Sequence, residues 1–209
     1  MNISMVVKNN GWAGCLDRLS LEIQMLHSPY KVVQMFEEEV AHYTGAPYAV
    51  SLNSCTNALF LACKWVGVED NEVTVPCRTY LSPPQSIRQA GGKLVFDNRK
   101  WEGIYQLKPF PVYDAAKRLT SGMYIPGTFM CLSFHIKKHL KIGKGGMILC
   151  DDPEAAEWFK ARRYEGRTAG VKYHEDFIDE EGWNMYMTPE QAARGLTLMQ
   201  NYPQHMPDQ

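Results

Sequence analysis

The chain has 209 residues, 45% of them hydrophobic, and this length can bury a substantial core in one domain. Its formal net charge of -1 argues against nucleic acid or an anionic membrane as a partner, because proteins that track phosphates usually carry a basic excess. Six cysteines without zinc-like spacing and a longest apolar stretch, residues 58–68, too short to span a bilayer, predict a cytoplasmic protein with no metal site.

The predicted elements follow an N-terminal arm, residues 1–30, in which we expect one helix around residues 16–26. Apolar residues recur at helical spacing from Lys31, and Gly45 supplies a natural stop for that helix. After it we expect, in chain order, a strand over 48–52, a helix over 56–66, a strand over 73–75, a helix over 84–90, a strand over 93–96, short strands at Val112, 129–133 and 147–149, and helices over 153–163 and 189–199.

Strands that alternate with helices are typical of a largely parallel sheet covered by helices on both faces. The sequence therefore predicts a three-layer α/β/α domain with a mostly parallel sheet. No internal repeat and no Pro/Gly/Ser linker divides the chain. We expect residues 31–209 to form a single α/β domain.

Two strand ends carry residues that suggest chemistry. The run SFHIKKHLKIGKGG, residues 133–146, follows an apolar strand and ends in a Gly-rich turn, a typical way to present a reactive side chain. It contains Lys138, and Asp114 follows another short apolar strand. A lysine and a carboxylate offered to one ligand suggest pyridoxal phosphate (PLP), whose aldehyde needs an amine and whose ring nitrogen needs a carboxylate. The alternatives are a surface lysine in a basic loop and an aspartate that caps a turn.

The run 133–146 resembles the lysine motif of the DegT/StrS-type aminotransferases, fold-type I enzymes that mostly aminate keto sugars attached to nucleotides. In the family's order, SLNSCTNALFLA (51–62) resembles its phosphate-binding turn, VPCRTYLS (75–82) its next strand end and GWNMYMTPEQAARGL (182–196) its Asn-containing segment. The likeness extends over roughly residues 31–200. It implies a reduced form of the large domain of a fold-type I PLP-dependent transferase.

The resemblance assigns roles to three residues. By register with the family motif, Lys138 rather than its neighbour Lys137 holds the cofactor aldehyde and moves protons. Asp114 pairs with the ring nitrogen, whose protonation lets the ring accept electrons from the substrate. Ser133 supplies a further hydroxyl at the family's position.

The cofactor phosphate is expected where a strand becomes a helix, at Ser54, Cys55 and Thr56, because helix N–H groups and the positive helix end attract anions. Ser54 or Thr56 as an ordinary N-cap predicts the same residue types. Cys55 stands where the relatives have glycine, so we expect its side chain to hinder close approach. Tyr80 matches the aromatic residue that stacks on the cofactor ring, although an aromatic near a strand end is more often core packing.

Asn184 matches the family asparagine that reaches the phosphate from the neighbouring subunit, which implies a homodimer. Lys117 departs from the family pattern, because it replaces the glutamine that bonds the cofactor's phenolic oxygen. Tyr113 replaces an acid and Tyr186 an arginine. Between Asp97 and Asp114 the connection is too short for the strand and helix that the family has there. We also expect the chain to lack the small C-terminal domain of the family.

We therefore expect a PLP-dependent aminotransferase that moves an amino group from a donor such as glutamate to a keto acceptor, which in this family is mostly a nucleotide-linked keto sugar. Two alternatives remain open. One is a non-catalytic PLP-binding or interaction module on the same fold. The other is a PLP-dependent elimination or dehydration enzyme, which the same electron sink permits.

Overall fold

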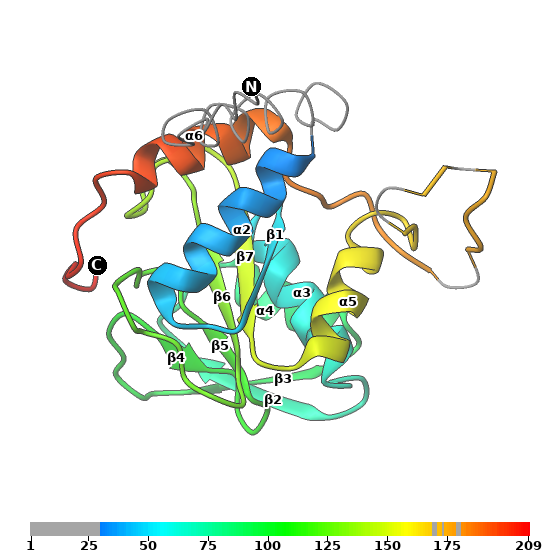
Figure 1. The fold of residues 1–209 in the computed structure, drawn as a ribbon. Coiled ribbons are helices and arrows are strands. Elements are labelled where there is room, and N and C mark those ends of the chain that lie inside the picture. The colour runs from blue at the N-terminus through cyan, green and yellow to red at the C-terminus, as the bar shows by residue number, and fades with distance from the viewer. Residues whose placement is uncertain (1–29, 169–170, 173, 179–180) are drawn as a thin grey trace, which may run out of the picture.

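The structure of the protein, a computed structural model, describes residues 30–168, 171–172, 174–178 and 181–209 (Figure 1). The helix expected around residues 16–26 and all but the last residue of the expected arm lie outside the described residues. No helix of the described part is long and apolar enough to cross a membrane.

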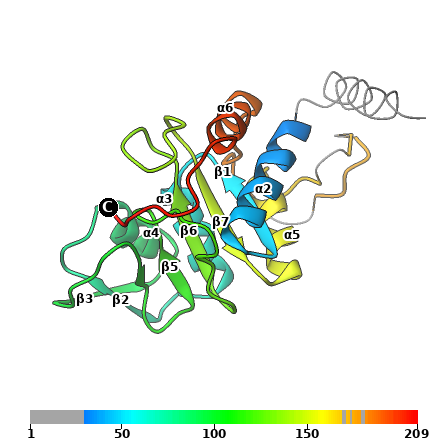
Figure 2. The same ribbon diagram turned by 60° about the vertical axis from the view of Figure 1, so that its left-hand side comes forward.

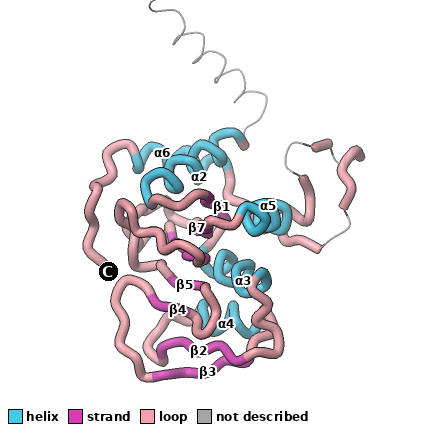
Figure 3. Tube along the Cα trace, turned by 60° about the horizontal axis from the view of Figure 1, so that its bottom comes forward, coloured by secondary structure: helices cyan, strands magenta, loops and turns pink. Residues whose placement is uncertain are grey.

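A five-stranded sheet and a two-stranded sheet form the central layer (Figure 3). The larger sheet has, in spatial order, the strands β1 (Tyr48–Leu52), β7 (Gly146–Cys150), β6 (Phe129–Ser133), β5 (Val112–Asp114) and β4 (Tyr105–Gln106). The smaller sheet pairs β2 (Glu72–Pro76) with β3 (Lys93–Asp97). An isolated bridge connects the two sheets, since the backbones of Thr74 and Lys108 exchange hydrogen bonds of 2.8 and 3.1 Å.

The strand directions are mixed, which corrects the expectation of a mostly parallel sheet. Among the strands of the described residues, β2–β3 and β5–β6 are parallel, whereas β1–β7, β6–β7 and β4–β5 are antiparallel. The loop between β6 and β7 folds back on itself, and β4 returns to β5 through the short turn 107–111, so both connections give antiparallel neighbours. Hydrophobic pattern predicts that a strand is buried but says nothing about its direction.

Helices cover both faces of this layer (Figures 1 and 2). On one face lie α2 (Lys31–Thr44) and α6 (Pro189–Met199), and on the other α3 (Cys55–Trp65), α4 (Ser82–Gln89) and α5 (Pro153–Arg162). Alternate residues of β6 enter the two cores: Met130 and Leu132 pack with α2 and α6, and Phe129 and Cys131 with α3 and α5. The three-layer α/β/α arrangement is thereby confirmed.

The expected helix limits hold to within two residues. Gly45 ends α2 with a left-handed backbone, φ 77°. The helix α4 begins at Ser82, earlier than expected, because its prolines lie in the first turn, where a missing N–H loses no bond. Between β3 and β5, the described residues 98–111 contain the two-residue strand β4 and no helix, as the shortness of this connection predicts.

Candidate active site

Asp114, the expected partner of the ring nitrogen, is the last residue of β5 and is 7% exposed. Its Oδ1 accepts a hydrogen bond from the backbone N–H of Ala116 at 2.9 Å, and its Oδ2 accepts one from the Tyr105 hydroxyl at 2.9 Å. Among the described residues it makes no ion pair. Because a carboxylate has about four acceptor sites, neutral donors hold Asp114 in place and leave sites for a cationic partner.

Opposing effects act on the acidity of Asp114. Burial raises its pKa above the ordinary value, and its two hydrogen bonds counteract part of the rise. The positive charges of Lys138 and Lys117 counteract it further. Burial also raises the pKa of the Cys55 thiol well above its usual range, and the charge of Lys138 opposes that rise too. Lys138 therefore lies within electrostatic reach of both Asp114 and Cys55.

The loop that carries Lys138, residues 134–145, has a defined shape, because backbone hydrogen bonds of 3.0 and 3.1 Å join its two arms. The N–H of Lys138 donates to the carbonyl of His135 at 2.8 Å. Lys138 is partly buried, whereas Lys137 is exposed. The sequence separates these two lysines only by register with a family motif. Burial and the interaction with Asp114 both favour Lys138 as the functional one.

The expected phosphate-binding turn lies where β1 ends and α3 begins. Ser54 is the N-cap of α3, and its hydroxyl accepts a hydrogen bond from the N–H of Asn57 at 3.2 Å. The N–H groups of Cys55 and Thr56 are in the first turn, where no helical carbonyl precedes them, so they are suited to bind an anion. Gly146 lets β7 pass close by, since a Cβ atom there would lie 2.3 Å from the backbone N of Cys55.

The side chain of Cys55, which we expected to hinder the approach of an anion, points away from the first turn of α3. Its Sγ donates to the carbonyl of Cys131 on β6 at 3.5 Å, and the residue is 8% exposed. The thiol thus points into the core, away from the N–H groups. Ser133, at the end of β6, is half-buried, and its hydroxyl accepts only a long hydrogen bond, 3.5 Å, from the N–H of His135.

The loop after β2 brings polar and aromatic groups toward Asp114. Tyr80 in this loop is 74% exposed, which excludes core packing as the explanation of this aromatic residue. Next to it, the hydroxyl of Thr79 lies 2.6 Å from the hydroxyl of Tyr105, which in turn bonds Asp114. The loop therefore contains an exposed aromatic ring, Tyr80, and a hydroxyl, Thr79, that is bonded to the partner of Asp114.

Lys117 lies three residues after Asp114 and is partly buried. Its ammonium group lies 5.1 Å from the centre of the Trp101 ring, a cation–π contact. Trp101 is held in place because its Nε1 donates to the carbonyl of Arg78 at 2.8 Å. The lysine that replaces the family glutamine is thus engaged by a tryptophan from the short connection between β3 and β5.

Asn184 is exposed, and its side-chain amide donates to Glu165 Oε1 at 3.2 Å. The next residue, Met185, accepts a hydrogen bond from the N–H of Asn53 at 2.8 Å. The Asn-containing segment therefore runs beside the residue that precedes Ser54 in its own chain. A contact from Asn184 to the phosphate site of a second subunit is a separate matter and remains a prediction.

Sequence reasoning missed Tyr105, whose hydroxyl donates to Asp114, and Thr79, whose hydroxyl bonds that of Tyr105. Tyr105 lies directly opposite Asp114 in the antiparallel pair β4–β5. The signal was present but weak: the proline-containing turn 107–111 separates two short stretches rich in apolar residues, which is compatible with a hairpin. A two-residue strand is too short for a hydrophobic period to reveal it.

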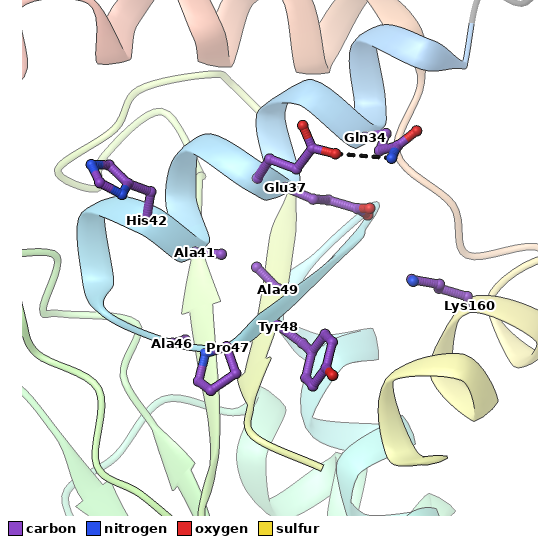
Figure 4. Close-up of a pocket in the computed structure, with 10 residues that line it drawn as sticks. Gln34, Glu37, Ala41, His42, Ala46, Pro47, Tyr48, Ala49 and Lys160 are labelled. Atoms are coloured by element: carbon purple, nitrogen blue, oxygen red, sulfur yellow. Dashed lines mark hydrogen bonds between the residues drawn. The ribbon is translucent and has the colours of Figure 1, made fainter. Parts of the chain in front are cut away.

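A hollow of about 390 Å³ lies at the outer edge of β1, between α2 and α5 (Figure 4). Its walls include Glu37, His42, Tyr48 and Lys160. None of the residues predicted for the cofactor lines it. The hollow is therefore distinct from the strand ends that carry Asp114 and Lys138.

The described residues fit the needs of PLP. A partly buried amine, Lys138, follows the strand β6, which is the neighbour of the strand β5 that ends in a buried carboxylate, Asp114, whose remaining acceptor sites suit a protonated ring nitrogen. The N–H groups at the start of α3 suit a phosphate. The arrangement can hold a cofactor ring by both ends, with a lysine at the reacting one.

Comparisons with known proteins agree with this chemistry. The model of the DegT/DnrJ/EryC1/StrS aminotransferase family matches residues 18–109 and 114–207. The spore coat polysaccharide biosynthesis protein SpsC of Bacillus subtilis is 29% identical, over 78% of this chain and 55% of its own length. GDP-perosamine synthase of Escherichia coli O157:H7 is 26% identical, over 86% of this chain and 60% of its own.

Solved structures share the fold. AtS13 from Actinomadura melliaura superposes with a TM-score of 0.72 at 21% identity, over 82% of this chain and 60% of that one. Spr1654 from Streptococcus pneumoniae, in its PMP-form, gives 0.70 at 20% identity, over 87% and 62%. The chain thus spans little more than half the length of the proteins it matches. Because the family model covers most of the chain, the protein belongs to the DegT/DnrJ/EryC1/StrS aminotransferase family.

Proposed function

We propose that this chain is a PLP-dependent sugar aminotransferase, or the cofactor-binding part of one. Family membership supports both the transferase class and PLP as the cofactor. The observation that carries the proposal is that β5 and β6 are parallel neighbours, so Asp114 at the end of β5 and the loop after β6 that carries Lys138 leave the sheet at the same edge. An amine and a carboxylate at one edge of the sheet are what the two ends of the cofactor require.

Lys138 would hold the cofactor through its side-chain amine and, once displaced by the amino donor, would carry the proton between the substrate Cα and the cofactor C4′. Asp114, held by neutral donors, would keep the ring nitrogen protonated. PLP supplies an electron sink for the bond that breaks at Cα. The partly buried position of Lys138 would limit the access of water to the reacting end.

The remaining assignments concern binding. Ser54 and the N–H groups of Cys55 and Thr56 would take the phosphate, with the hydroxyl of Ser133 beside them. Tyr80, whose ring is exposed, would stack on the cofactor ring. Asn184 would reach the phosphate of a neighbouring subunit, which makes the active unit a homodimer.

For the reaction, glutamate is the proposed amino donor and a keto sugar attached to a nucleotide the proposed acceptor. The support comes from relatives: several carry names such as GDP-perosamine synthase and UDP-4-amino-4,6-dideoxy-N-acetyl-beta-L-altrosamine transaminase. Both names denote amino sugars on nucleotides.

A second candidate is a PLP-binding protein that does not transaminate. One observation favours it: Lys117, which replaces the family glutamine at the cofactor's phenolic oxygen, is engaged by Trp101. A cation near that oxygen would change the electronics of the ring. Conversion of the bound cofactor by glutamate separates the two candidates.

The test is covalent attachment of PLP. The protein is incubated with PLP and then reduced with borohydride, and the modified lysine is mapped by mass spectrometry. We expect modification at Lys138, its loss in Lys138→Ala, and its retention in the matched control Lys137→Ala. Attachment at another lysine, or an unchanged yield in Lys138→Ala, would refute the assignment. If the visible band of the attached cofactor does not change on addition of glutamate, the second candidate holds.

A further inference from the structure

Residues 98–111 are the part of the site that the family resemblance did not assign. They form the short connection between β3 and β5 and contain Tyr105, which is 4% exposed. Its hydroxyl is 2.9 Å from Asp114 Oδ2 and 2.6 Å from the hydroxyl of Thr79. A hydroxyl inside this connection therefore touches the carboxylate that the proposed function places at the ring nitrogen.

The chemistry of the three groups fixes the direction of these bonds. An ionised carboxylate can only accept, so the Tyr105 hydroxyl must donate its proton to Asp114. The oxygen of Tyr105 is then free to accept, and the Thr79 hydroxyl becomes the donor to it. The chain of bonds runs from Thr79 through Tyr105 to Asp114. Each bond orients the next group and strengthens the next donor.

The surroundings of Tyr105 hold its ring in one position. Tyr105 pairs directly with Asp114 across β4 and β5, so both side chains lie on the same face. Its ring packs edge-on against Trp101, with ring centres 4.7 Å apart. A buried ring in a fixed position sets the orientation of the carboxylate more narrowly than an exposed side chain could.

We propose that Tyr105, supported by Thr79, is a positioning residue that orients the Asp114 carboxylate toward the ring nitrogen of the cofactor. This inference rests on the proposed function. The N–H of Ala116 bonds Oδ1 and the hydroxyl of Tyr105 bonds Oδ2. Together these two bonds fix the orientation of the carboxyl group. Residues of the shortened connection thus support the group on which the electron sink depends.

A purely structural tyrosine would also satisfy its hydroxyl in this way, so the test needs a measurement other than stability. Two measurements are suitable. The first is the pKa of Asp114 in the protein without cofactor, measured by NMR of its carboxyl carbon. The second is the affinity for PLP, measured from the visible absorbance of the protein-bound cofactor. The variants are Tyr105→Phe, which keeps the ring, and Thr79→Val, which keeps the Tyr105 hydroxyl.

In Tyr105→Phe, the pKa of Asp114 should rise, because the ionised form loses a donor. Affinity for PLP should fall about tenfold, the size of a lost hydrogen bond to a charged group. Thr79→Val should weaken PLP binding less, by about threefold, and Thr79→Ser should restore it. Tyr113→Phe is the matched control, because Tyr113 packs against the core on the opposite face of the sheet, and it should change neither quantity.

Two results would overturn the inference. If Tyr105→Phe binds PLP as tightly as the wild type does, Tyr105 does not position Asp114. If it binds PLP more tightly, the hydroxyl competes with the ring nitrogen for the carboxylate. Failure of the proposed function looks different, since the wild-type protein itself would then attach no PLP at Lys138.

Discussion

Two buried carboxylates in this protein are held in opposite ways. Glu37 on α2 is 6% exposed and accepts hydrogen bonds from the N–H and the hydroxyl of Ser51, at 2.8 and 2.7 Å, and it forms an ion pair with Arg163. Asp114 is 7% exposed, and within the described part of the chain the two groups that donate to it, the Tyr105 hydroxyl and the Ala116 N–H, are neutral. The charge of Glu37 is matched within the fold. The negative charge of Asp114 has no ion-pair partner among the described residues, as expected for a carboxylate that binds a cationic ligand.

The largest expected effect concerns the matched carboxylate. Glu37→Ala removes the ionic partner of Arg163, whose side chain is 13% exposed and keeps only its bonds to Ser51, and should lower the free energy of unfolding by about 2–4 kcal/mol. Urea unfolding at neutral pH measures this loss. The control is Glu39→Ala on the exposed side of the same helix, which should stay within about 0.5 kcal/mol of the wild type. If Glu37→Ala lowers the free energy of unfolding by less than about 1 kcal/mol, the ion pair of Glu37 does not distinguish it from Asp114.

A second experiment separates fold from ligand at Ser54, whose hydroxyl caps α3 and is also proposed to bind phosphate. Ser54→Ala should lower the free energy of unfolding by about 1 kcal/mol through loss of the cap. Ser54→Asp keeps a good cap, so stability should be retained, but its charge should repel the phosphate of PLP. Unfolding curves and PLP titrations of both variants check this. Equal PLP binding by Ser54→Asp and the wild type would remove Ser54 from the phosphate site.

The smallest stability effect is expected at Asp114, and it should depend on pH. Burial raises the pKa of Asp114 in the fold, so the ionised form is less favourable there than in the unfolded chain. The stability that Asp114 contributes is therefore present below its unfolded pKa and is lost as the pH rises through the folded pKa.

Asp114→Asn removes this loss, because its amide can still accept from Ala116 and donate to the oxygen of Tyr105. The melting temperature of Asp114→Asn minus that of the wild type should therefore increase as the pH rises from about 4 to neutrality. Thermal unfolding without PLP at a series of pH values measures the difference. If Asp114→Asn is less stable than the wild type at neutral pH, as expected for Glu37→Ala, then the charge of Asp114 is stabilised by groups within the fold.

Much of the fold follows from local sequence pattern. The apolar period of α2 and its glycine stop, the buried strands β6 and β7, and the alternation of strand and helix all predict elements that the structure has. Strand direction does not follow, because a buried strand has the same composition whether its neighbour is parallel or antiparallel. The strand β4 has only two residues and leaves no pattern.

The candidate site could be predicted from the sequence where family motifs mark it, and elsewhere it could not. Motifs single out Lys138 and Asp114, and the structure adds that Lys138 is partly buried whereas Lys137 is exposed. Tyr105 escaped notice because its partner is fixed by pairing across a hairpin that the sequence barely signals. The orientation of Cys55 into the core likewise depends on the position of β6, which no local pattern contains.

The junction between the two sheets has a consequence for motion. Besides the bridge between Thr74 and Lys108, it is secured by Arg99, whose Nη2 donates to the carbonyls of Thr74 and Gln106 at 3.2 and 2.6 Å. Because few hydrogen bonds join the two sheets, this junction should open locally more often than the paired strands within each sheet. The amide protons of Thr74 and Lys108 should therefore exchange with deuterium sooner than those of the central strands. Thr79 and Tyr80 follow β2 in the smaller sheet, whereas Lys138 follows β6 in the larger one. Opening of the junction would therefore weaken the contacts of Thr79 and Tyr80 with a bound cofactor ring without moving Lys138.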